Sequence, residues 1–380
     1  IPLLVEIDTA ARDLHSVNTV AFRDGRAIGY NTDILGFSES LARDGVTLRG
    51  KKVLLLGYGG AASVMAYHCV TQGAYVTITG RNLDKAAALQ KQLCAAIPGA
   101  HVAVFSRRHI PRDIQIVLNS TPVGMYPKES TAPLHYLPHK TEYVFDAIYN
   151  PPVTATMKLA NHKKTKTRDG LYMLVMQAAH AQTIWSGVQF EPQACETILR
   201  RTYGKMAVKR LHEKHSKRNI VLCGFMGSGK TTIGRKLARL TGLDFVDADQ
   251  YLEAQEGKKI SDIFADEGEA YFRDRETAYI KELSQRNGIV LSLGGGAVLR
   301  PENVEAVRET GLLIHLDTPY YRILKNLSYS NTRPLLDKPD KQAETRRLYN
   351  ARKAIYHRVA DVSVRSPKIS EVLEKVVKSI

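Results

Sequence analysis

The chain has 380 residues, a length that favours two domains because one hydrophobic core rarely organises so many. Hydrophobic residues make up 44% and charged residues 24%, and no apolar run could span a bilayer, so the composition is that of a globular protein and excludes disordered and membrane classes. The formal net charge of +16 is spread along the chain without a nucleic-acid-binding motif, so we expect anionic small molecules as partners, no nucleic acid and no membrane.

Short apolar runs alternate with helical patterns in the first half of the chain. Residues 53–57 (VLLLG) precede a helical pattern at 61–73, and another apolar run follows at 74–80. This alternation predicts an α/β fold with a parallel sheet. After the first run, Gly57-x-Gly59-x-x-Ala62 fits the glycine-rich fingerprint that binds the pyrophosphate of a dinucleotide.

The end of the next strand indicates which dinucleotide is bound. The sequence there is TGRNLDK (residues 79–85), with no Asp or Glu directly at the strand end to hold a ribose 2′-hydroxyl but with Arg81 and Lys85 where a 2′-phosphate would lie. This basic pair favours NADP(H) over NAD(H). The alternative is a cationic turn exposed to water.

Six motifs give the first half of the chain a family resemblance. In chain order they are SVNTV (16–20), GYNTD (29–33), LGYGGAA (56–62), NSTPVGM (119–125), FDAIYNPPVTATM (145–157) and DGLYMLVMQAA (169–179). Residues 1–190 resemble shikimate dehydrogenase, which implies an NADP-dependent reduction of 3-dehydroshikimate. The resemblance assigns the hydroxylated ring to Asn18, Asp33, Tyr149 and Gln177, with Asp33 also catalytic. It assigns NADP(H) to Gly57, Gly59, Gly60, Ala61, Arg81, Asn82 and Lys85.

Two features of this half leave alternatives open. Asp33 also has the position of an N-cap for the helical pattern at 34–45. The resemblance implies that a catalytic lysine, a serine pair and most of the substrate domain's sheet precede Ile1, so we expect a remnant of that domain and negligible dehydrogenase turnover, since a positioned acid-base group contributes roughly 10²–10⁴-fold. The alternative to a dehydrogenase is that this half of the chain is a non-catalytic scaffold or an NADP-sensing module. Tyr58 is bulkier than the small residue usual at its place in the glycine loop.

Residues 191–218 are rich in lysine and arginine and compatible with a helix. They precede the apolar run NIVLCGF (219–225), so we interpret them as a basic helical linker. The alternative is a solvated helix packed on either domain.

A complete phosphate-binding motif follows that apolar run. Residues 224–231 satisfy GxxxxGK[ST] between a strand and a helix, the context that the motif requires. In such a loop backbone N–H groups surround phosphate oxygens, Lys230 neutralises the β and γ charges, and Thr231 offers its hydroxyl to Mg²⁺. The alternative is a chance glycine turn before a helix. The residues expected to bind ATP here are Gly227, Ser228, Gly229, Lys230, Thr231 and Thr232.

Further motifs indicate the acceptor. They are FVDAD (245–249), FRDRE (272–276), LSLGGGAV (291–298), NTRPLL (331–336) and YNARKAIY (349–356). Residues 219 to about 365 resemble shikimate kinase, which implies ATP-dependent phosphorylation of the shikimate 3-hydroxyl. The alternative is a P-loop kinase for another small hydroxy acid.

The resemblance assigns roles in the second site. Arg273 and Arg352 hold the carboxylate, Asp249 binds the ring hydroxyls and acts as the base, and the backbone of Gly294, Gly295 and Gly296 closes on the substrate. Arg333 joins Lys230 at the transferring phosphoryl group and the bound ATP. Asp247, which we place on the same strand face as Asp249, holds Mg²⁺ with Thr231. Lys325 stands nearest to the family's adenine-contacting arginine.

The sequence therefore predicts a two-domain α/β protein. A Rossmann-type NADP-binding domain with a remnant of the substrate domain occupies residues 1–190, a linker 191–218, and a P-loop domain like the nucleoside monophosphate kinases 219–380. The four cysteines stand far apart in the sequence, which argues against disulfides and zinc and favours reduced thiols in a cytoplasmic protein.

Overall fold

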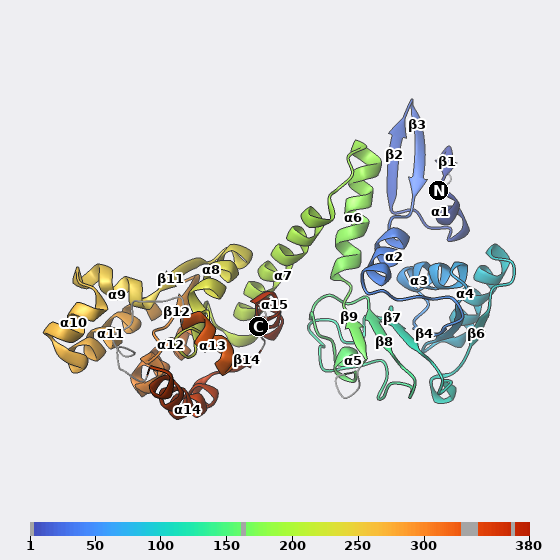
Figure 1. Ribbon diagram of the computed structural model, residues 1–380. Coiled ribbons are helices and arrows are strands. Elements are labelled where there is room, and N and C mark those ends of the chain that lie inside the picture. Colours follow the sequence, from blue (N-terminus) through green and yellow to red (C-terminus); the bar gives the residue numbers. More distant parts are fainter. Residues whose placement is uncertain (1–3, 161–164, 328–340, 366–368) are drawn as a thin grey trace. The chain divides into compact units, whose positions relative to one another are not determined.

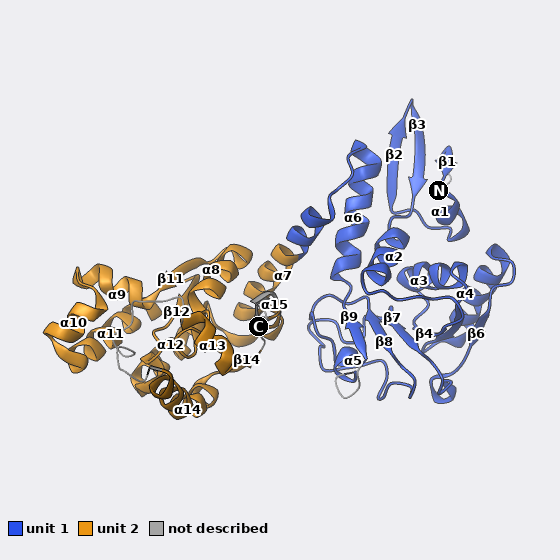
Figure 2. Ribbon diagram, viewed as in Figure 1, with its two compact units in different colours: residues 1–199 blue, residues 200–380 orange. Residues whose placement is uncertain are grey.

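A computed structural model describes residues 4–160, 165–327, 341–365 and 369–380. The chain forms two compact units, residues 1–199 and residues 200–380 (Figure 2). The boundary between them falls within helix α7 (Pro192–His215). No helix among the described residues is long and apolar enough to cross a membrane.

Unit 1 is built on a six-stranded parallel sheet. Its strand order is β6-β5-β4-β7-β8-β9, the order that defines a Rossmann fold, so the predicted fold class is confirmed. The strands are β4 (Lys52–Leu56), β5 (Tyr75–Thr79), β6 (Val102–Val104), β7 (Ile116–Asn119), β8 (Tyr143–Asp146) and β9 (Lys166–Arg168). The central strands are almost continuously apolar because both faces of the sheet are buried.

Helices cover this sheet. They include α2 (Asp33–Arg43), α3 (Gly60–Thr71), α4 (Leu83–Ala96), α5 (Ala155–Lys158) and α6 (Leu171–Ser186), and Figure 1 shows α3 and α4 beside the sheet. A short exposed turn, η1 (Arg107–His109), lies between β6 and β7 in the chain. The largest core cluster includes Phe37, Met65, Ile78 and Phe145. Helices α2 and α6 approach closely at Gly36, where a Cβ atom would lie 2.4 Å from the Met173 carbonyl oxygen.

A small three-stranded sheet completes unit 1. Its strands are β1 (Glu6–Ile7), β2 (Thr19–Arg23) and β3 (Arg26–Tyr30), in the order β1-β3-β2, with α1 (Thr9–Asp13) following β1. Strands β2 and β3 form a hairpin whose turn residues Asp24 and Gly25 both have positive φ, as an Asp-Gly hairpin turn requires.

Unit 2 contains a five-stranded parallel sheet in the order β11-β12-β10-β13-β14. The strands are β10 (Asn219–Cys223), β11 (Asp244–Asp247), β12 (Ile289–Ser292), β13 (Gly311–Leu316) and β14 (Val362–Val364). The helices are α8 (Lys230–Thr241), α9 (Ala248–Glu256), α10 (Ile260–Asp266), α11 (Gly268–Ser284), α12 (Pro301–Thr310), α13 (Tyr320–Leu327), α14 (Lys341–Val359), α15 (Ile369–Ser379) and the short η2 (Ala297–Leu299).

The basic segment at residues 191–218, which was expected to be helical, forms helix α7 over most of its length. In unit 1 its first turns place Glu196 in an ion pair with Arg43, at 2.7 Å. In unit 2 its later turns bury Ala207 and Leu211 in the core. Its function as a linker stays a prediction.

Candidate active sites

The phosphate-binding loop of unit 2 lies between β10 and α8. Gly224, Gly227 and Gly229 have φ values of 147°, 75° and 91°, a region of backbone space that favours glycine. Helix α8 begins at Lys230 with no side chain capping its first turn. The loop therefore presents uncapped backbone N–H groups at the positive end of a helix, which suits an anion.

Two predicted side chains of this loop have defined partners. The Lys230 Nζ atom donates to the carbonyl oxygens of Gly224 at 2.9 Å and Phe225 at 3.2 Å. The Thr231 hydroxyl donates to Asp247 Oδ2 at 2.8 Å, so a hydroxyl and a carboxylate are already adjacent where Mg²⁺ is expected.

The relation expected between Asp247 and Asp249 is wrong. Asp247 is the last residue of β11, but Asp249 lies in the first turn of α9. The second carboxylate oxygen of Asp247 accepts a hydrogen bond from the Gln250 backbone N–H at 3.4 Å, which caps α9 and ends the strand. The two carboxylates thus lie on different elements.

Two side chains that the sequence motifs did not indicate donate hydrogen bonds to backbone carbonyls of the phosphate-binding loop. The Thr318 hydroxyl donates to the Ser228 carbonyl oxygen at 2.9 Å, and Asn326 Nδ2 donates to that of Gly227 at 2.7 Å. A Cβ atom on Gly227 would lie 3.1 Å from Leu327 Cγ. Thr318 follows β13, and Asn326 and Leu327 belong to α13, so the segment after β13 fixes the loop.

The glycine run that follows β12 lies against the predicted acceptor residues. A Cβ atom on Gly294 would lie 2.7 Å from both Asp249 Oδ1 and Glu276 Oε1. On Gly296 it would lie 2.8 Å from both terminal nitrogens of Arg273. The structure therefore brings Asp249, Arg273 and the glycine run to one place.

Arg273 is held by a carboxylate that the sequence analysis did not single out. Its Nη1 atom donates to Glu276 Oε2 at 2.7 Å, and Glu269 accepts from the same guanidinium at 3.2 Å. Burial raises the pKa of Glu276, against the effect of the Arg273 charge, and nearby Asp249 raises it further. Burial acts to lower the pKa of Arg273, but the two glutamates outweigh it and the net pKa is raised.

Arg352 lies in α14, four residues before the buried Tyr356. The Tyr356 hydroxyl donates to the carbonyl oxygen of Gly295. Burial raises the pKa of Tyr356, while the charges of Arg352 and Arg273 oppose this shift. The charges of both predicted arginines therefore act on the pKa of the same buried phenol. Lys325 lies on α13, and Arg333 lies outside the described residues.

The glycine loop of unit 1 joins β4 to α3. Gly57 has a φ of 116°, and a Cβ atom there would lie 2.4 Å from Ser120 Oγ. A Cβ atom on Gly59 or Gly60 would meet nothing within 4 Å, and α3 begins without a side-chain cap. Ala61 packs against the core. The loop therefore faces open space at a helix N-terminus, a geometry that fits a pyrophosphate.

The expected 2′-phosphate residues lie after β5. Arg81 and Lys85 are exposed, whereas the Asn82 side chain accepts from the Lys85 backbone N–H at 3.0 Å and caps α4. The ring of Tyr58 lies on Gly80, where a Cβ atom would be 2.5 Å from Tyr58 Cε1. The bulky residue of the loop is thus matched to a glycine at the end of β5.

Three of the four predicted ring-binding residues of unit 1 are linked through Thr32. Asn18 Oδ1 accepts from the Thr32 backbone N–H at 2.9 Å, and the Thr32 hydroxyl donates to Gln177 Oε1 at 3.3 Å. Asp33 follows in the chain; burial raises its pKa, and a hydrogen bond with Asn18 opposes the shift. Tyr149 is 41% exposed and lies after β8.

The alternative role of Asp33 as an N-cap is wrong. Helix α2 begins at Asp33, with Thr32 in the cap position and no side-chain cap. The Asp33 backbone N–H instead donates to Asn31 Oδ1 at 3.1 Å. The Asp33 carboxylate therefore does not cap the start of α2.

Comparison with known proteins decides the family of the second site. The family model described as shikimate kinase matches residues 226–380. A shikimate kinase of Psychrobacter cryohalolentis is 46% identical over 144 residues, which cover 38% of this chain and 77% of that relative. The chain belongs to the shikimate kinase family. The prediction of a shikimate kinase is thereby confirmed, and unit 2 is called the kinase unit below.

Solved structures give similarities for both predicted halves. A shikimate kinase from Acinetobacter baumannii in complex with shikimate has 34% identity and a TM-score of 0.42, covering 45% of this chain and 96% of that chain. A shikimate dehydrogenase in complex with NADP⁺ has 33% identity and a TM-score of 0.48, covering 52% of this chain and 70% of that chain.

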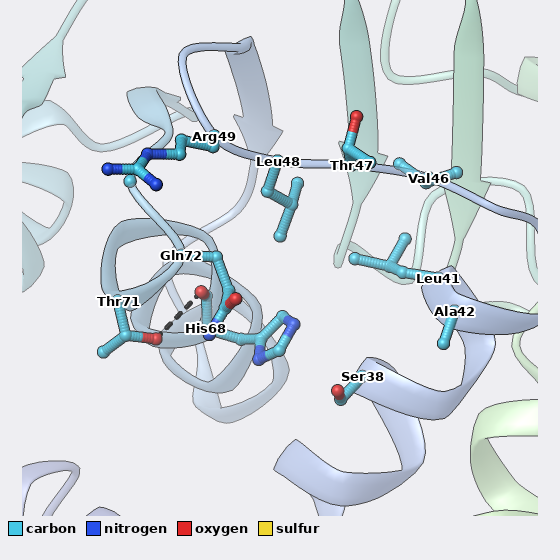
Figure 3. Close-up of a pocket in the computed structure, with 11 residues that line it drawn as sticks. Ser38, Leu41, Ala42, Val46, Thr47, Leu48, Arg49, His68, Thr71 and Gln72 are labelled. Carbon is cyan, nitrogen blue, oxygen red and sulfur yellow. Dashed lines mark hydrogen bonds between the residues drawn. The ribbon is translucent and has the colours of Figure 1, made fainter.

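A cavity of unit 1 lies away from every predicted site residue. Figure 3 shows Arg49, His68 and Gln72 around it, with α2 on the other side, and its volume is about 640 Å³. It lies at the amino end of β4, whereas the glycine loop follows the carboxyl end. Among the described residues, no cluster of three or more His, Cys, Asp or Glu side chains could hold a metal ion.

Proposed function

We propose that the kinase unit transfers the γ-phosphoryl group of ATP to the 3-hydroxyl of shikimate. The observation that carries this proposal is the contact between the two loops: a Cβ atom on Gly295 would lie 3.3 Å from the Met226 backbone nitrogen. The glycine run of the acceptor residues therefore packs on the phosphate loop itself. An acceptor held there stands next to the phosphates, which is what direct transfer requires.

The acceptor residues have distinct tasks. Arg273 and Arg352 bind the shikimate carboxylate, because a guanidinium can donate two parallel hydrogen bonds to it. Asp249 accepts a hydrogen bond from the 3-hydroxyl and takes its proton as the oxygen attacks phosphorus. Gly294 and Gly296 leave the room that Asp249 and Arg273 fill, since a Cβ atom at either position would overlap those side chains.

The phosphate loop supplies charge and positioning. Lys230 and the N–H groups at the start of α8 bind the β and γ oxygens. Thr231 and Asp247 fit Mg²⁺, because their oxygens are 2.8 Å apart and both are ligands that this ion prefers. When held there, Mg²⁺ would supply positive charge to offset that of the phosphates. The family resemblance adds Arg333 over the phosphoryl group.

Shikimate methyl ester tests the carboxylate assignment. The full chain should release ADP with Mg·ATP and shikimate, and the ester should raise KM about a hundredfold, because two charged hydrogen-bond pairs are lost. In Arg273→Ala and Arg352→Ala the difference between acid and ester should shrink to a few fold. An unchanged difference in both variants would support the alternative, a kinase for another small hydroxy acid.

For unit 1 we propose NADP(H) binding at the glycine loop, with a hydroxylated ring acid at Asn18, Asp33, Tyr149 and Gln177. The open backbone of Gly59 and Gly60 and the uncapped start of α3 support the first part. The exposed Arg81 and Lys85 support a 2′-phosphate over a free 2′-hydroxyl. The chemistry that NADPH supplies to such a site is hydride donation, here to 3-dehydroshikimate.

The test is titration of the full chain with NADPH and NADH, followed by nucleotide fluorescence. We expect NADPH to bind at least tenfold more tightly, and Arg81→Ala to reduce that preference. Equal affinities would contradict the assignment. Dehydrogenase turnover is measured separately; NADPH binding without reduction of 3-dehydroshikimate would favour the scaffold or sensing alternative.

A further inference from the structure

Two consecutive backbone carbonyls of the phosphate-binding loop are held by side chains of the segment that follows β13. The Thr318 hydroxyl donates to the Ser228 carbonyl oxygen at 2.9 Å, and both residues are buried. The exposed Asn326, on α13, donates from Nδ2 to the Gly227 carbonyl oxygen at 2.7 Å. Both carbonyls therefore point out of the loop, toward residues 318–327.

The hydrogen bond from Thr318 sets the direction of an N–H group. The peptide between Ser228 and Gly229 is trans, and in a trans peptide the C=O and N–H bonds point in opposite directions. Because its carbonyl is held by Thr318, this peptide directs the Gly229 N–H toward the opposite face of the loop. Gly229 directly precedes α8, which has no side-chain cap. The Gly229 N–H thus joins the N–H groups at the start of α8 that suit an anion.

The loop's own groups do not orient this peptide. The peptide before it is fixed at both ends, since the Gly227 carbonyl accepts from Asn326 and the Ser228 N–H donates to the Phe225 carbonyl oxygen at 3.1 Å. In the part of the chain that the structure describes, the Ser228 Oγ atom is buried and has no hydrogen-bond partner. The Ser228 side chain therefore fixes neither peptide, and the Ser228–Gly229 peptide depends on the Thr318 hydroxyl.

This arrangement goes beyond what core packing needs. Apolar contacts already attach α13 to the loop, because one core cluster contains Ile323, Leu327, Phe225 and Met226. Such contacts have no preferred direction, whereas a hydrogen bond requires its donor and acceptor to be aligned. Valine would fill the same space as Thr318 without burying a hydroxyl, which is costly unless hydrogen-bonded. The Thr318 hydroxyl therefore orients the loop rather than packing it.

We infer that Thr318 and Asn326 are positioning residues for ATP: they hold two carbonyls of the phosphate-binding loop so that the Gly229 N–H faces the phosphates. Both act through the loop backbone and not by contact with the nucleotide. Their loss should therefore weaken nucleotide binding and leave acceptor binding unchanged. The inference rests on the proposed function, in which this loop binds the phosphates of ATP.

The test is Thr318→Val in the full chain, which keeps the shape of the side chain and removes the hydroxyl. We expect the ADP Kd, measured by calorimetry, and the ATP KM to rise about tenfold, because an N–H donor to the phosphates is no longer oriented. The shikimate KM should stay within twofold of wild type and kcat within threefold, since the donor serves ground state and transition state alike. Thr318→Ser keeps a hydroxyl and should bring the ADP Kd back to within threefold of wild type.

Thr310→Val is the matched control. The Thr310 hydroxyl is also buried and also donates to a distant backbone carbonyl of the kinase unit, that of Ser284, at 2.6 Å. Thr310 directly precedes β13, so it lies at the end of the sheet opposite to the loop. Its substitution should leave the ADP Kd within twofold of wild type. An ADP Kd that Thr318→Val does not raise, or that Thr310→Val raises equally, would overturn the inference. A Thr318→Ser protein that binds ADP as weakly as Thr318→Val would do the same.

Two more variants keep the outcomes separable. Asn326→Ala changes an exposed side chain, so it does not depend on the folding of Thr318→Val; we expect the ADP Kd to rise about threefold, and an unchanged Kd would overturn the inference. Lys230→Ala tests the proposed function by itself, because an unchanged ADP Kd there would show that the phosphates do not bind at this loop. Weaker ADP binding in Lys230→Ala without any change in Thr318→Val would overturn the inference alone.

Discussion

Arg273 Nη1 donates to Glu276 Oε2 at 2.7 Å, and Glu276 is 4% exposed. The same arginine also contacts Glu269, whose side chain is 60% exposed. One buried and one exposed carboxylate therefore hold the guanidinium that we assign to the acceptor.

Glu276→Gln tests which carboxylate matters. The neutral amide leaves Arg273 less firmly held, so we expect the shikimate KM to rise several fold and the free energy of unfolding of the kinase unit to fall by roughly 1–3 kcal/mol. Glu269→Gln is the matched control and should alter neither by much, because exposed ion pairs contribute little. Equal effects of the two substitutions on KM would contradict the assignment.

The glycine run gives a steric prediction. Gly294→Ala would put a methyl group 2.7 Å from the Asp249 and Glu276 carboxylates, and Gly296→Ala 2.8 Å from the Arg273 guanidinium. Each should reduce kcat/KM for shikimate by at least tenfold, because the displaced side chains are those that bind and activate the acceptor. The ADP Kd, measured by calorimetry, should stay within threefold for both. A loss of ADP binding would show that the loop had collapsed.

His315 gives a prediction about pH. Burial, reinforced by nearby His357, lowers the pKa of His315 to about 4, against 6.5 for an unperturbed histidine. The unfolded chain therefore binds more protons between pH 6.5 and pH 4, so this contribution to stability is fully present above pH 6.5 and is lost as pH falls toward 4. Its full size is about 3 kcal/mol.

Amide hydrogen exchange of β10 and β13, corrected for intrinsic rates, measures this contribution in the full chain. Between pH 7 and pH 5 the wild type should lose roughly 2 kcal/mol more than His315→Phe, which keeps the stack on Tyr356 but cannot titrate. Identical pH dependence in the two proteins would contradict a buried neutral His315.

Tyr58 and Gly80 give a prediction for unit 1. Gly80→Ala would place a methyl group 2.5 Å from the Tyr58 ring and should lower the free energy of unfolding by roughly 1–3 kcal/mol. In the Tyr58→Ala background the same change should cost less than about 0.5 kcal/mol, because the ring is gone. The one tryptophan of the chain, Trp185, lies in unit 1, so its fluorescence in urea follows this unit. Additive costs would contradict the contact.

Motifs in the sequence were enough to predict both parallel sheets and both glycine loops, because a glycine-rich turn between an apolar run and a helical pattern is typical of parallel α/β domains. They also named Asp249, Arg273 and the glycine run, which the structure brings together. Thr318 and Tyr356 were missed because each donates to the backbone of a loop distant in the sequence, whereas Glu276 was missed although it lies only three residues after its partner Arg273. The relation of Asp247 to Asp249 was wrong because a helix cap ends the strand between them.

The most direct test of the central claim is the product that the full chain makes from Mg·ATP and shikimate. Phosphorus NMR should show shikimate 3-phosphate forming in step with ADP, and Asp249→Asn should slow this by at least a hundredfold, since it removes the proposed base. A product phosphorylated at another hydroxyl, or ADP release without a phosphorylated shikimate, would contradict the account.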